Sequence, residues 1–313
     1  MKRLFCVLPC YNEEEVLPET SQRLKQKYDK LMQADRISKD SKILFVNDGS
    51  KDSTWDIIEK LHYDDPIFQG VCLSKNMGHQ NALLAGLMVA SQKADMVISM
   101  DVDLQDDINA MDEMLDKYYQ GADVVYGVRK ERKTDTFFKR FTAQSFYKMM
   151  AMLGADIEYN HADYRLMSKR ALEGLAEFPE VNLFLRGLVP MVGYRSDKVF
   201  YDRAERFAGE SKYPLKKMLH FAVEGITSLS VKPIRMIFGL GIAIFVVSIL
   251  VLAYCIIGSI NGGTVPGWTT IVVSVWAIGG LIMISLGVIG EYIGKVYLET
   301  KRRPKYIIDK ILD

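Results

Sequence analysis

The sequence predicts an α/β protein with a Rossmann-like, mostly parallel sheet, followed by an interfacial helix and two transmembrane helices. In the N-terminal half, short apolar runs alternate with helical patterns at short loop spacing, which is typical of a parallel sheet covered on both faces. In the last quarter, two charge-free apolar runs are each long enough to cross about 30 Å of hydrocarbon. The net charge of the 313 residues is only +1, so no overall field attracts nucleic acid.

Five strands are expected, each from a short and continuously apolar run: residues 4–8, 43–46, 71–73, 96–101 and 123–126. Between them, apolar residues recur at near-helical spacing, so helices should end near Leu31, Leu61 and Ser91, and another should surround Met111. Ligands collect outside the carboxyl ends of strands in such a sheet. The loops that follow the strands are therefore the candidate site.

The fourth strand runs into DVDLQD, residues 101–106. Two carboxylates one residue apart repel each other unless a cation lies between them, and hard oxygen donors suit Mg²⁺ or Mn²⁺. The alternative is a solvated turn in which Asp103 or Asp106 caps the next helix. Polar groups at the other strand ends favour a nucleotide pocket: Asn12, Glu13, Asp48 and Asn76.

Two of these groups also have an ordinary structural explanation. Asp48 could brace the Gly49 turn, and Asn12 could cap a helix. No Walker loop and no G-x-G-x-x-G follows the first strand, so a metal rather than a glycine-rich loop would hold the phosphates.

Four motifs, in order, carry a family resemblance: LPCYNE at 8–13, VNDGS at 46–50, SKNMG at 74–78 and DVDLQ at 101–105. They resemble the motifs of family 2 glycosyltransferases with the GT-A fold. Within that family, the chain is similar to the polyprenyl-phosphate glycosyltransferases, the group of dolichol-phosphate mannose synthase and bactoprenol glucosyl transferase. The match covers nearly the whole chain. Cys10 departs from it, because such enzymes more often carry a small or branched residue there.

The resemblance implies roles for particular residues. The nucleotide sugar donor would be bound by Pro9, Tyr11, Asn12, Glu13, Asp48, Asn76, Gly78, Asp101, Val102 and Asp103. The divalent metal, Mg²⁺ or Mn²⁺, would be held by Asp101, Asp103 and Gln105. The acceptor phosphate would be clamped by Arg129, Arg132, Arg203, Arg206, Ser211 and Lys212.

Asp163 and Arg165 are the predicted catalytic residues. The resemblance places Asp163 near the anomeric carbon, either as a base or as a group that orients the sugar or the arginines. A lipid monophosphate is mostly dianionic at neutral pH, so it hardly needs a base. Arg165 would help to hold that dianion beside the diphosphate.

The implied reaction is inverting transfer of a sugar to a polyprenyl phosphate such as undecaprenyl (bactoprenol) phosphate, for cell-envelope or lipopolysaccharide modification. UDP-glucose is the expected donor, with GDP-mannose, UDP-N-acetylglucosamine or another UDP-sugar as alternatives. A processive polysaccharide synthase is disfavoured, because no Gln-x-x-Arg-Trp motif is present. A non-catalytic membrane scaffold is disfavoured, because all three predicted metal donors are retained.

The predicted domains are a catalytic domain over 1–212, an amphipathic interfacial helix over 213–231, a transmembrane hairpin over 232–293 and a cytosolic basic tail over 294–313. The spans cover about 234–257 and 268–290. In 213–231 apolar residues recur at helical spacing, a pattern that a buried core helix shares.

Lysines and arginines flank the spans, whereas the loop at 258–267 has none. The positive-inside rule therefore predicts a multi-pass protein of the plasma (inner) membrane with its catalytic domain and both termini in the cytosol. Glycines in the spans could serve the hairpin or a homo-oligomer, or could be present simply because membrane helices tolerate glycine. No secretory signal opens the chain, and the four cysteines match no zinc spacing, so they are expected to be reduced.

Overall fold

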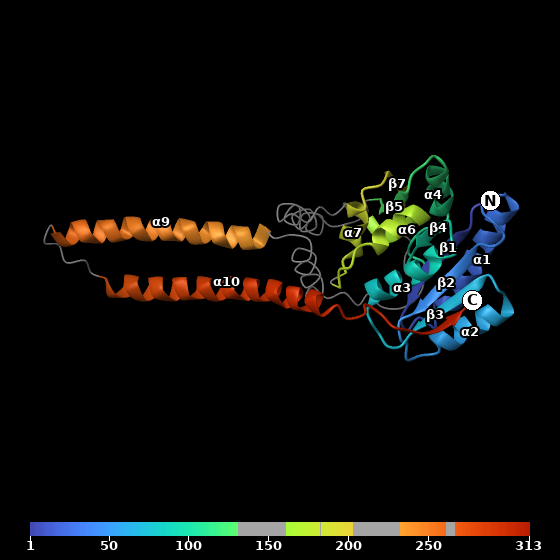
Figure 1. Cartoon of the computed structure of the whole chain (residues 1–313), viewed down its shortest axis with the longest axis horizontal. Helices are drawn as coiled ribbons and strands as arrows, with labels where there is room; N and C mark the ends of the chain where they lie inside the picture. Colours follow the sequence, from blue (N-terminus) through green and yellow to red (C-terminus); the bar gives the residue numbers. More distant parts are fainter. Residues whose placement is uncertain (131–160, 182, 203–231, 261–266) are drawn as a thin grey trace. The chain divides into compact units, whose positions relative to one another are not determined.

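The computed structural model describes residues 1–130, 161–181, 183–202, 232–260 and 267–313. These residues belong to two compact units. One unit contains a single eight-stranded sheet with its helices, and the other contains two long C-terminal helices (Figure 1).

The centre of the sheet is parallel, as the sequence predicted. β1 (Leu4–Cys10) pairs with β2 (Lys42–Asn47) on one side and with β4 (Met96–Ser99) on the other, and β2 pairs with β3 (Phe68–Leu73). Every residue of β1 and β4 is buried. Strands that are buried on both faces are mostly apolar, which explains why these runs stood out in the sequence.

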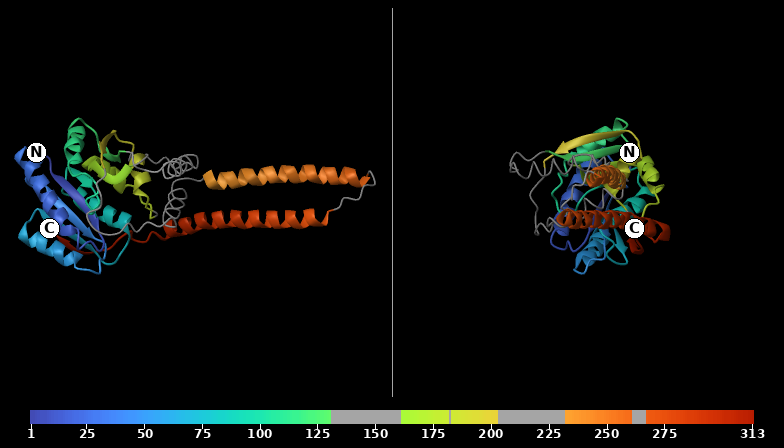
Figure 2. Two further views of the ribbon diagram at one scale, coloured as in Figure 1. Left: turned by 180° about the vertical axis from the view of Figure 1, so that it is seen from behind. Right: turned by 90° about the vertical axis from the view of Figure 1, so that its left-hand side faces the viewer.

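Helices cover both faces of this sheet (Figure 2). One apolar cluster joins the sheet to α1 (Leu17–Gln33), α2 (Thr54–Asp64) and α4 (Ala110–Tyr119). The other cluster joins it to α3 (His79–Ser91), α6 (Lys169–Ala176) and α7 (Leu185–Met191). The predicted α/β class with a mostly parallel sheet is thus confirmed.

Three strands were not predicted. The full order is β7-β5-β6-β4-β1-β2-β3-β8. β6 (His161–Ser168) lies between β4 and β5 (Val124–Arg129) and is antiparallel to both, whereas β7 (Ser196–Tyr201) extends the sheet parallel to β5. Neither β6 nor β7 is a continuous apolar run, so the criterion that found the other strands passed over them.

The C-terminal segment corrects the expectation of a basic tail over 294–313. Its first part continues a helix as far as Lys301, and β8 (Ile308–Leu312) pairs antiparallel with β3 at the edge of the sheet. β8 is short and contains both an aspartate and a lysine, so its sequence gives little sign of a strand. Its pairing covers backbone groups of β3 that would otherwise lie at an open edge.

The second unit contains α9 (Lys232–Ile260) and α10 (Trp268–Lys301), which run side by side at the predicted spans (Figures 1 and 2). In the described part of the chain, one stretch, Ile278–Lys301, is long and apolar enough to cross a membrane. A shorter apolar stretch covers Ile234–Ile244. The pair of spans therefore stays a prediction, and the expected interfacial helix at 213–231 lies outside the described residues.

Seven glycines whose surroundings the structure describes do not serve the contact between α9 and α10. A Cβ atom added at any of them would have no heavy atom within 4 Å: Gly239, Gly241, Gly279, Gly280, Gly287, Gly290 and Gly294. The cysteines Cys6, Cys10 and Cys72 are free thiols.

Candidate active site

The loops after β1 and β2 are tied to each other. The backbone N–H of Asn12 donates to Ser50 Oγ at 3.0 Å, and the backbone N–H of Lys51 donates to Asn12 Oδ1 at 2.9 Å. Asn12 adopts a left-handed conformation with φ of 54°, which Asn tolerates better than most residues. The predicted donor-binding residue Asn12 is thus exposed and fixed in place, and it does not cap a helix.

Asp48 fixes the next loop. Its Oδ1 accepts a hydrogen bond from the backbone N–H of Met77 at 2.7 Å, and its Oδ2 accepts one from Gly78 at 3.0 Å. Burial raises the pKa of Asp48, although these two bonds lower it. Asp48 therefore braces the loop between β3 and α3 rather than the Gly49 turn.

Gly49 is required for this arrangement. Its φ is +62°, and a Cβ atom there would lie 2.5 Å from the backbone nitrogen of Asn76. The loops after β2 and β3 therefore approach each other more closely than a side chain would allow.

The acidic loop after β4 has the donors that were predicted for a metal. Asp101 keeps 35% of its side chain exposed, whereas Asp103 is buried and its Oδ1 accepts a hydrogen bond from the backbone N–H of Gln105 at 3.1 Å. Leu104, which follows Asp103, has φ of 58°, a strained conformation for a bulky side chain. Burial raises the pKa of Asp101 to about 6 despite the opposing effect of His79.

These donors fit a divalent cation by their chemistry. Neighbouring carboxylates, Asp103 among them, add to the raised pKa of Asp101, and such repulsion is relieved by a positive charge. No cluster of three or more His, Cys, Asp or Glu side chains that could hold an ion occurs among the described residues. The set would thus be two carboxylates with the Gln105 amide, completed by substrate oxygens as is usual for Mg²⁺.

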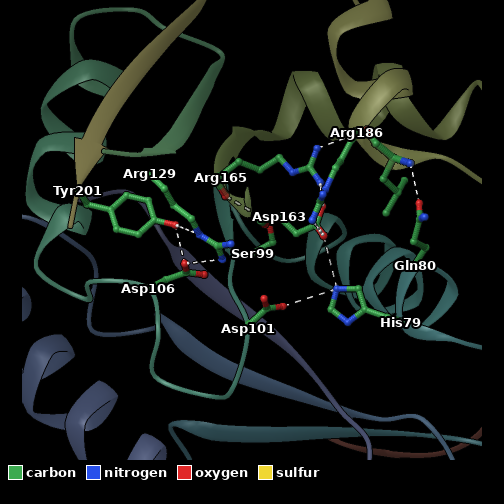
Figure 3. A network of polar contacts seen from close by, with 11 residues as sticks. His79, Gln80, Ser99, Asp101, Asp106, Arg129, Asp163, Arg165, Arg186 and Tyr201 are labelled. Atoms are coloured by element: carbon green, nitrogen blue, oxygen red, sulfur yellow. Dashed lines mark hydrogen bonds and ion pairs between the residues drawn. The ribbon is translucent and has the colours of Figure 1, made fainter. Parts of the chain in front are cut away.

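His79, at the start of α3, lies between two carboxylates (Figure 3). Its Nε2 is 3.6 Å from Asp101 Oδ1 and 3.7 Å from Asp163 Oδ2. Burial alone would lower the pKa of His79, but Asp163 and Asp101 raise it above its ordinary value. Sequence reasoning missed His79, because a single histidine after a glycine carries no sign of the carboxylates that it meets.

Asp163, on β6, is held by two arginines. Its Oδ1 accepts hydrogen bonds from Arg165 Nη2 at 2.8 Å and from Arg186 Nε at 3.3 Å, and its Oδ2 accepts one from Arg186 Nη2 at 3.0 Å. Burial raises the pKa of Asp163, but Arg186, His79 and Arg165 together hold it well below its usual range. So acidic a carboxyl is a poor base, and the geometry favours the alternative that Asp163 orients the arginines.

Arg165 is not positioned as predicted. Only 1% of its side chain is exposed, its Nη1 donates to the carbonyl of Leu185 at 3.3 Å, and its Nη2 donates to Asp163. Burial lowers its pKa, although Asp163 opposes the shift. Side chains two residues apart on a strand point to the same face, so Arg165 follows Asp163 into the interior. This corrects the expectation that Arg165 itself holds a phosphate.

Arg129 lies in a separate cluster. Its Nη2 donates to Asp106 Oδ1 at 3.0 Å, its Nε donates to the Tyr201 hydroxyl at 3.2 Å, and that hydroxyl donates to Asp106 Oδ1 at 2.5 Å. Burial alone would lower the pKa of Arg129, but Asp106 and Tyr201 raise it. The structure thus pairs this predicted phosphate ligand with a buried carboxylate, and Asp106 does not cap a helix.

Other predicted residues are more scattered. Pro9 and Val102 are buried, Tyr11 and Asn76 are more accessible, and the backbone N–H of Glu13 donates to Thr54 Oγ1 at 2.9 Å. Gly78 has φ of +86° at the start of α3, and a Cβ atom added there would have no heavy atom within 4 Å. Several predicted acceptor residues lie outside the described part of the chain: Arg132, Arg203, Arg206, Ser211 and Lys212.

The sequence model described as Glycosyl transferase family 2 matches residues 5–175. The chain belongs to this family. It is therefore a glycosyltransferase, as its motifs predicted.

Three relatives of this family 2 glycosyltransferase are similar over almost their whole length. The uncharacterized glycosyltransferase YkoT of Bacillus subtilis is 53% identical, with 98% of this chain and 91% of that protein aligned. The prophage bactoprenol glucosyl transferase homolog of Escherichia coli is 40% identical, with 99% of both aligned. The bactoprenol glucosyl transferase of Shigella phage SfII is 41% identical, with 98% of both aligned.

Proposed function

We propose that this family 2 glycosyltransferase transfers a sugar from a nucleotide sugar to a polyprenyl phosphate at the cytosolic face of the membrane. The observation that carries the proposal is the meeting of an acidic loop, Asp101 to Gln105, with the Asp163–Arg186 pair at the ends of neighbouring strands. The carboxylates of the acidic loop suit the metal of a metal-bound diphosphate, and the guanidinium of Arg186 suits a second phosphate. Two relatives that carry bactoprenol in their names support the choice of acceptor.

On the donor side, Asp101, Asp103 and Gln105 would hold Mg²⁺ or Mn²⁺. A bound divalent cation neutralises the charge that develops on a leaving diphosphate. The loops that carry Asn12 and Asn76 would contact the base and ribose, and the hydrogen bonds around Asp48 keep them rigid before the ligand arrives.

On the acceptor side, the second pKa of a phosphate monoester is about 6, so the nucleophile is already mostly dianionic at neutral pH. No residue has to remove a proton from it, which agrees with the low pKa of Asp163. A single in-line displacement then inverts the anomeric centre.

Glucose from UDP-glucose is the proposed sugar, because both of these relatives are named glucosyl transferases. GDP-mannose and other UDP-sugars are the alternatives. We further propose that α9 and α10 both span the membrane with the catalytic unit in the cytosol, since basic residues flank the pair and the loop between them has none.

The test is a panel of nucleotide sugars with the purified full-length protein, undecaprenyl phosphate and either Mg²⁺ or Mn²⁺. We expect a single glucosylated lipid product with an inverted anomeric centre. Absence of transfer from every donor, with metal and acceptor both present, would overturn the proposal.

The metal site has its own variant. Asp103→Ala should abolish transfer, whereas Asp116→Ala, which changes an exposed carboxylate on α4, should leave it unchanged. Full activity of Asp103→Ala in metal-buffered solution would remove this aspartate from the metal site.

A further inference from the structure

The residue before Arg186 is fixed through both of its backbone polar groups. The N–H of Leu185 donates to Gln80 Oε1, from α3, at 2.8 Å. The carbonyl of Leu185 accepts from Arg165 Nη1, from β6, at 3.3 Å. Since Leu185 is itself 1% exposed, the start of α7 is positioned by the two elements that border the site.

The side chain of Arg186 is fixed as well. Its Nε and Nη2 both donate to the Asp163 carboxylate, so the plane of the guanidinium is set by a bidentate pair. A long side chain that is held in this way loses little further freedom when it binds a ligand.

The two arginines on Asp163 differ in exposure. The side chain of Arg165 is 1% exposed and that of Asp163 is 13% exposed, whereas that of Arg186 is 32% exposed. One carboxylate therefore faces two guanidinium groups, and the guanidinium of Arg186 is the one that solvent and ligands can reach. His79 links this cluster to Asp101 of the acidic loop.

We propose that Arg186 binds a phosphoryl group of a substrate, and that Asp163, Arg165 and Gln80 are the residues that position it. This inference rests on the proposed function, because it takes the ligand to be a phosphorylated substrate of that reaction. Arg165 and Asp163 are then explained as a buried support. A planar guanidinium matches the geometry of phosphate oxygens, which a lysine amine does not.

Two sources could supply the phosphoryl group: the diphosphate of the nucleotide sugar or the monophosphate of the lipid. The experiment therefore measures both. UDP binding is titrated calorimetrically with Mn²⁺ present, and KM is measured separately for the nucleotide sugar and for undecaprenyl phosphate, using the full chain in detergent.

Arg186→Ala should weaken the binding of one of these two substrates by about ten-fold or more, as expected for loss of a charge-assisted hydrogen bond. Arg186→Lys should retain part of the affinity, because it keeps the charge and loses the fork. Arg170→Ala is the matched control, since Arg170 is 65% exposed on α6 and lies over the ring of Tyr194. Gln80→Ala should raise the same KM as Arg186→Ala, by a smaller factor.

A change confined to UDP binding and the donor KM assigns Arg186 to the diphosphate, and a change confined to the acceptor KM assigns it to the lipid phosphate. No shift beyond that of Arg170→Ala in any measurement would overturn the inference. If Arg186→Ala does not fold, Arg186→Lys decides, and wild-type values for it would also overturn the inference. Lack of any transfer by the wild-type enzyme refutes the proposed function instead, while UDP binding still tests Arg186.

Discussion

Removal of the Asp163 carboxylate should cost the catalytic unit much of its stability. In Asp163→Ala the guanidinium of Arg165 remains 1% exposed in its original site but loses its charged partner. An uncompensated buried charge costs about 3–5 kcal/mol. In a domain of roughly 200 residues, 1 kcal/mol corresponds to about 2–4 °C in Tm, so Tm should fall by about 6–20 °C.

The double variant Asp163→Ala, Arg165→Met separates this cause from others. It removes the stranded charge and fills its site with an apolar, unbranched side chain. Replacement of a buried ion pair by apolar residues is often neutral for stability, so the double variant should regain most of the lost Tm. The other arginine on Asp163 is partly exposed, and solvent screens its charge.

Thermal and urea unfolding of the full-length protein in detergent, followed by circular dichroism, measures these effects. Glu19→Ala is the control, because the Arg23–Glu19 pair on α1 is exposed and such pairs contribute about 0.3–0.5 kcal/mol. If Asp163→Ala lowered the midpoint no more than Glu19→Ala, or if the double variant were no more stable than the single one, the buried-charge argument would be wrong.

Three further outcomes are expected. Gly49→Ala should lower the unfolding free energy by about 2 kcal/mol or more, since its Cβ atom would lie 2.5 Å from a backbone nitrogen. Gly78→Ala, which has open space around the added Cβ atom, should lower it by about 1 kcal/mol. Equal midpoints of the two variants in urea unfolding would contradict this. Leu312→Ala should lower the unfolding free energy by about 1–2 kcal/mol in the same assay, because Leu312 of β8 packs against the core of the sheet. Ile307→Ala should lower it hardly at all, because Ile307 is 56% exposed. Equal losses would refute the claim that β8 packs on the core. The pKa of Asp163 is depressed, so its stabilising effect is fully present above the unfolded pKa of about 3.9 and is lost as pH falls further. Above about pH 6 the neighbouring His79, whose pKa Asp163 raises, also titrates, so the comparison is made on the acid side. The difference in unfolding free energy between wild type and Asp163→Asn should keep its size as pH falls from about 5.5 to 4.5, and a difference that shrinks already near pH 5 would exclude the low pKa.

The centre of the sheet could be predicted well from the sequence, because strands that are buried on both faces are usually continuous apolar runs. β6 is also buried on both faces, but one of these faces contains Asp163 and Arg165, which can be buried because they form an ion pair. A pattern that scores apolar residues cannot recognise a strand that has an ion pair on one buried face.

In the candidate site, too, some residues could be found from a local sequence pattern and others could not. Asp101 and Asp103 could be found because they stand at the end of an apolar run. Arg186 could not, since its partner Asp163 lies 23 residues away and the two meet only after β6 and α7 are packed. Arg129 was predicted as a phosphate ligand, but its pairing with Asp106 depends on contacts between strand ends that no local pattern encodes.

The position of β8 affects how this protein is made. Its pairing partner, β3, leaves the ribosome early, whereas β8 follows α9 and α10 in the chain. The catalytic sheet therefore has an open edge throughout synthesis of the hydrophobic hairpin, and it is completed only after that hairpin has been translated. A fragment that stops before α9 would keep this edge permanently open, so a soluble catalytic fragment should be designed with residues 303–313 rejoined to it.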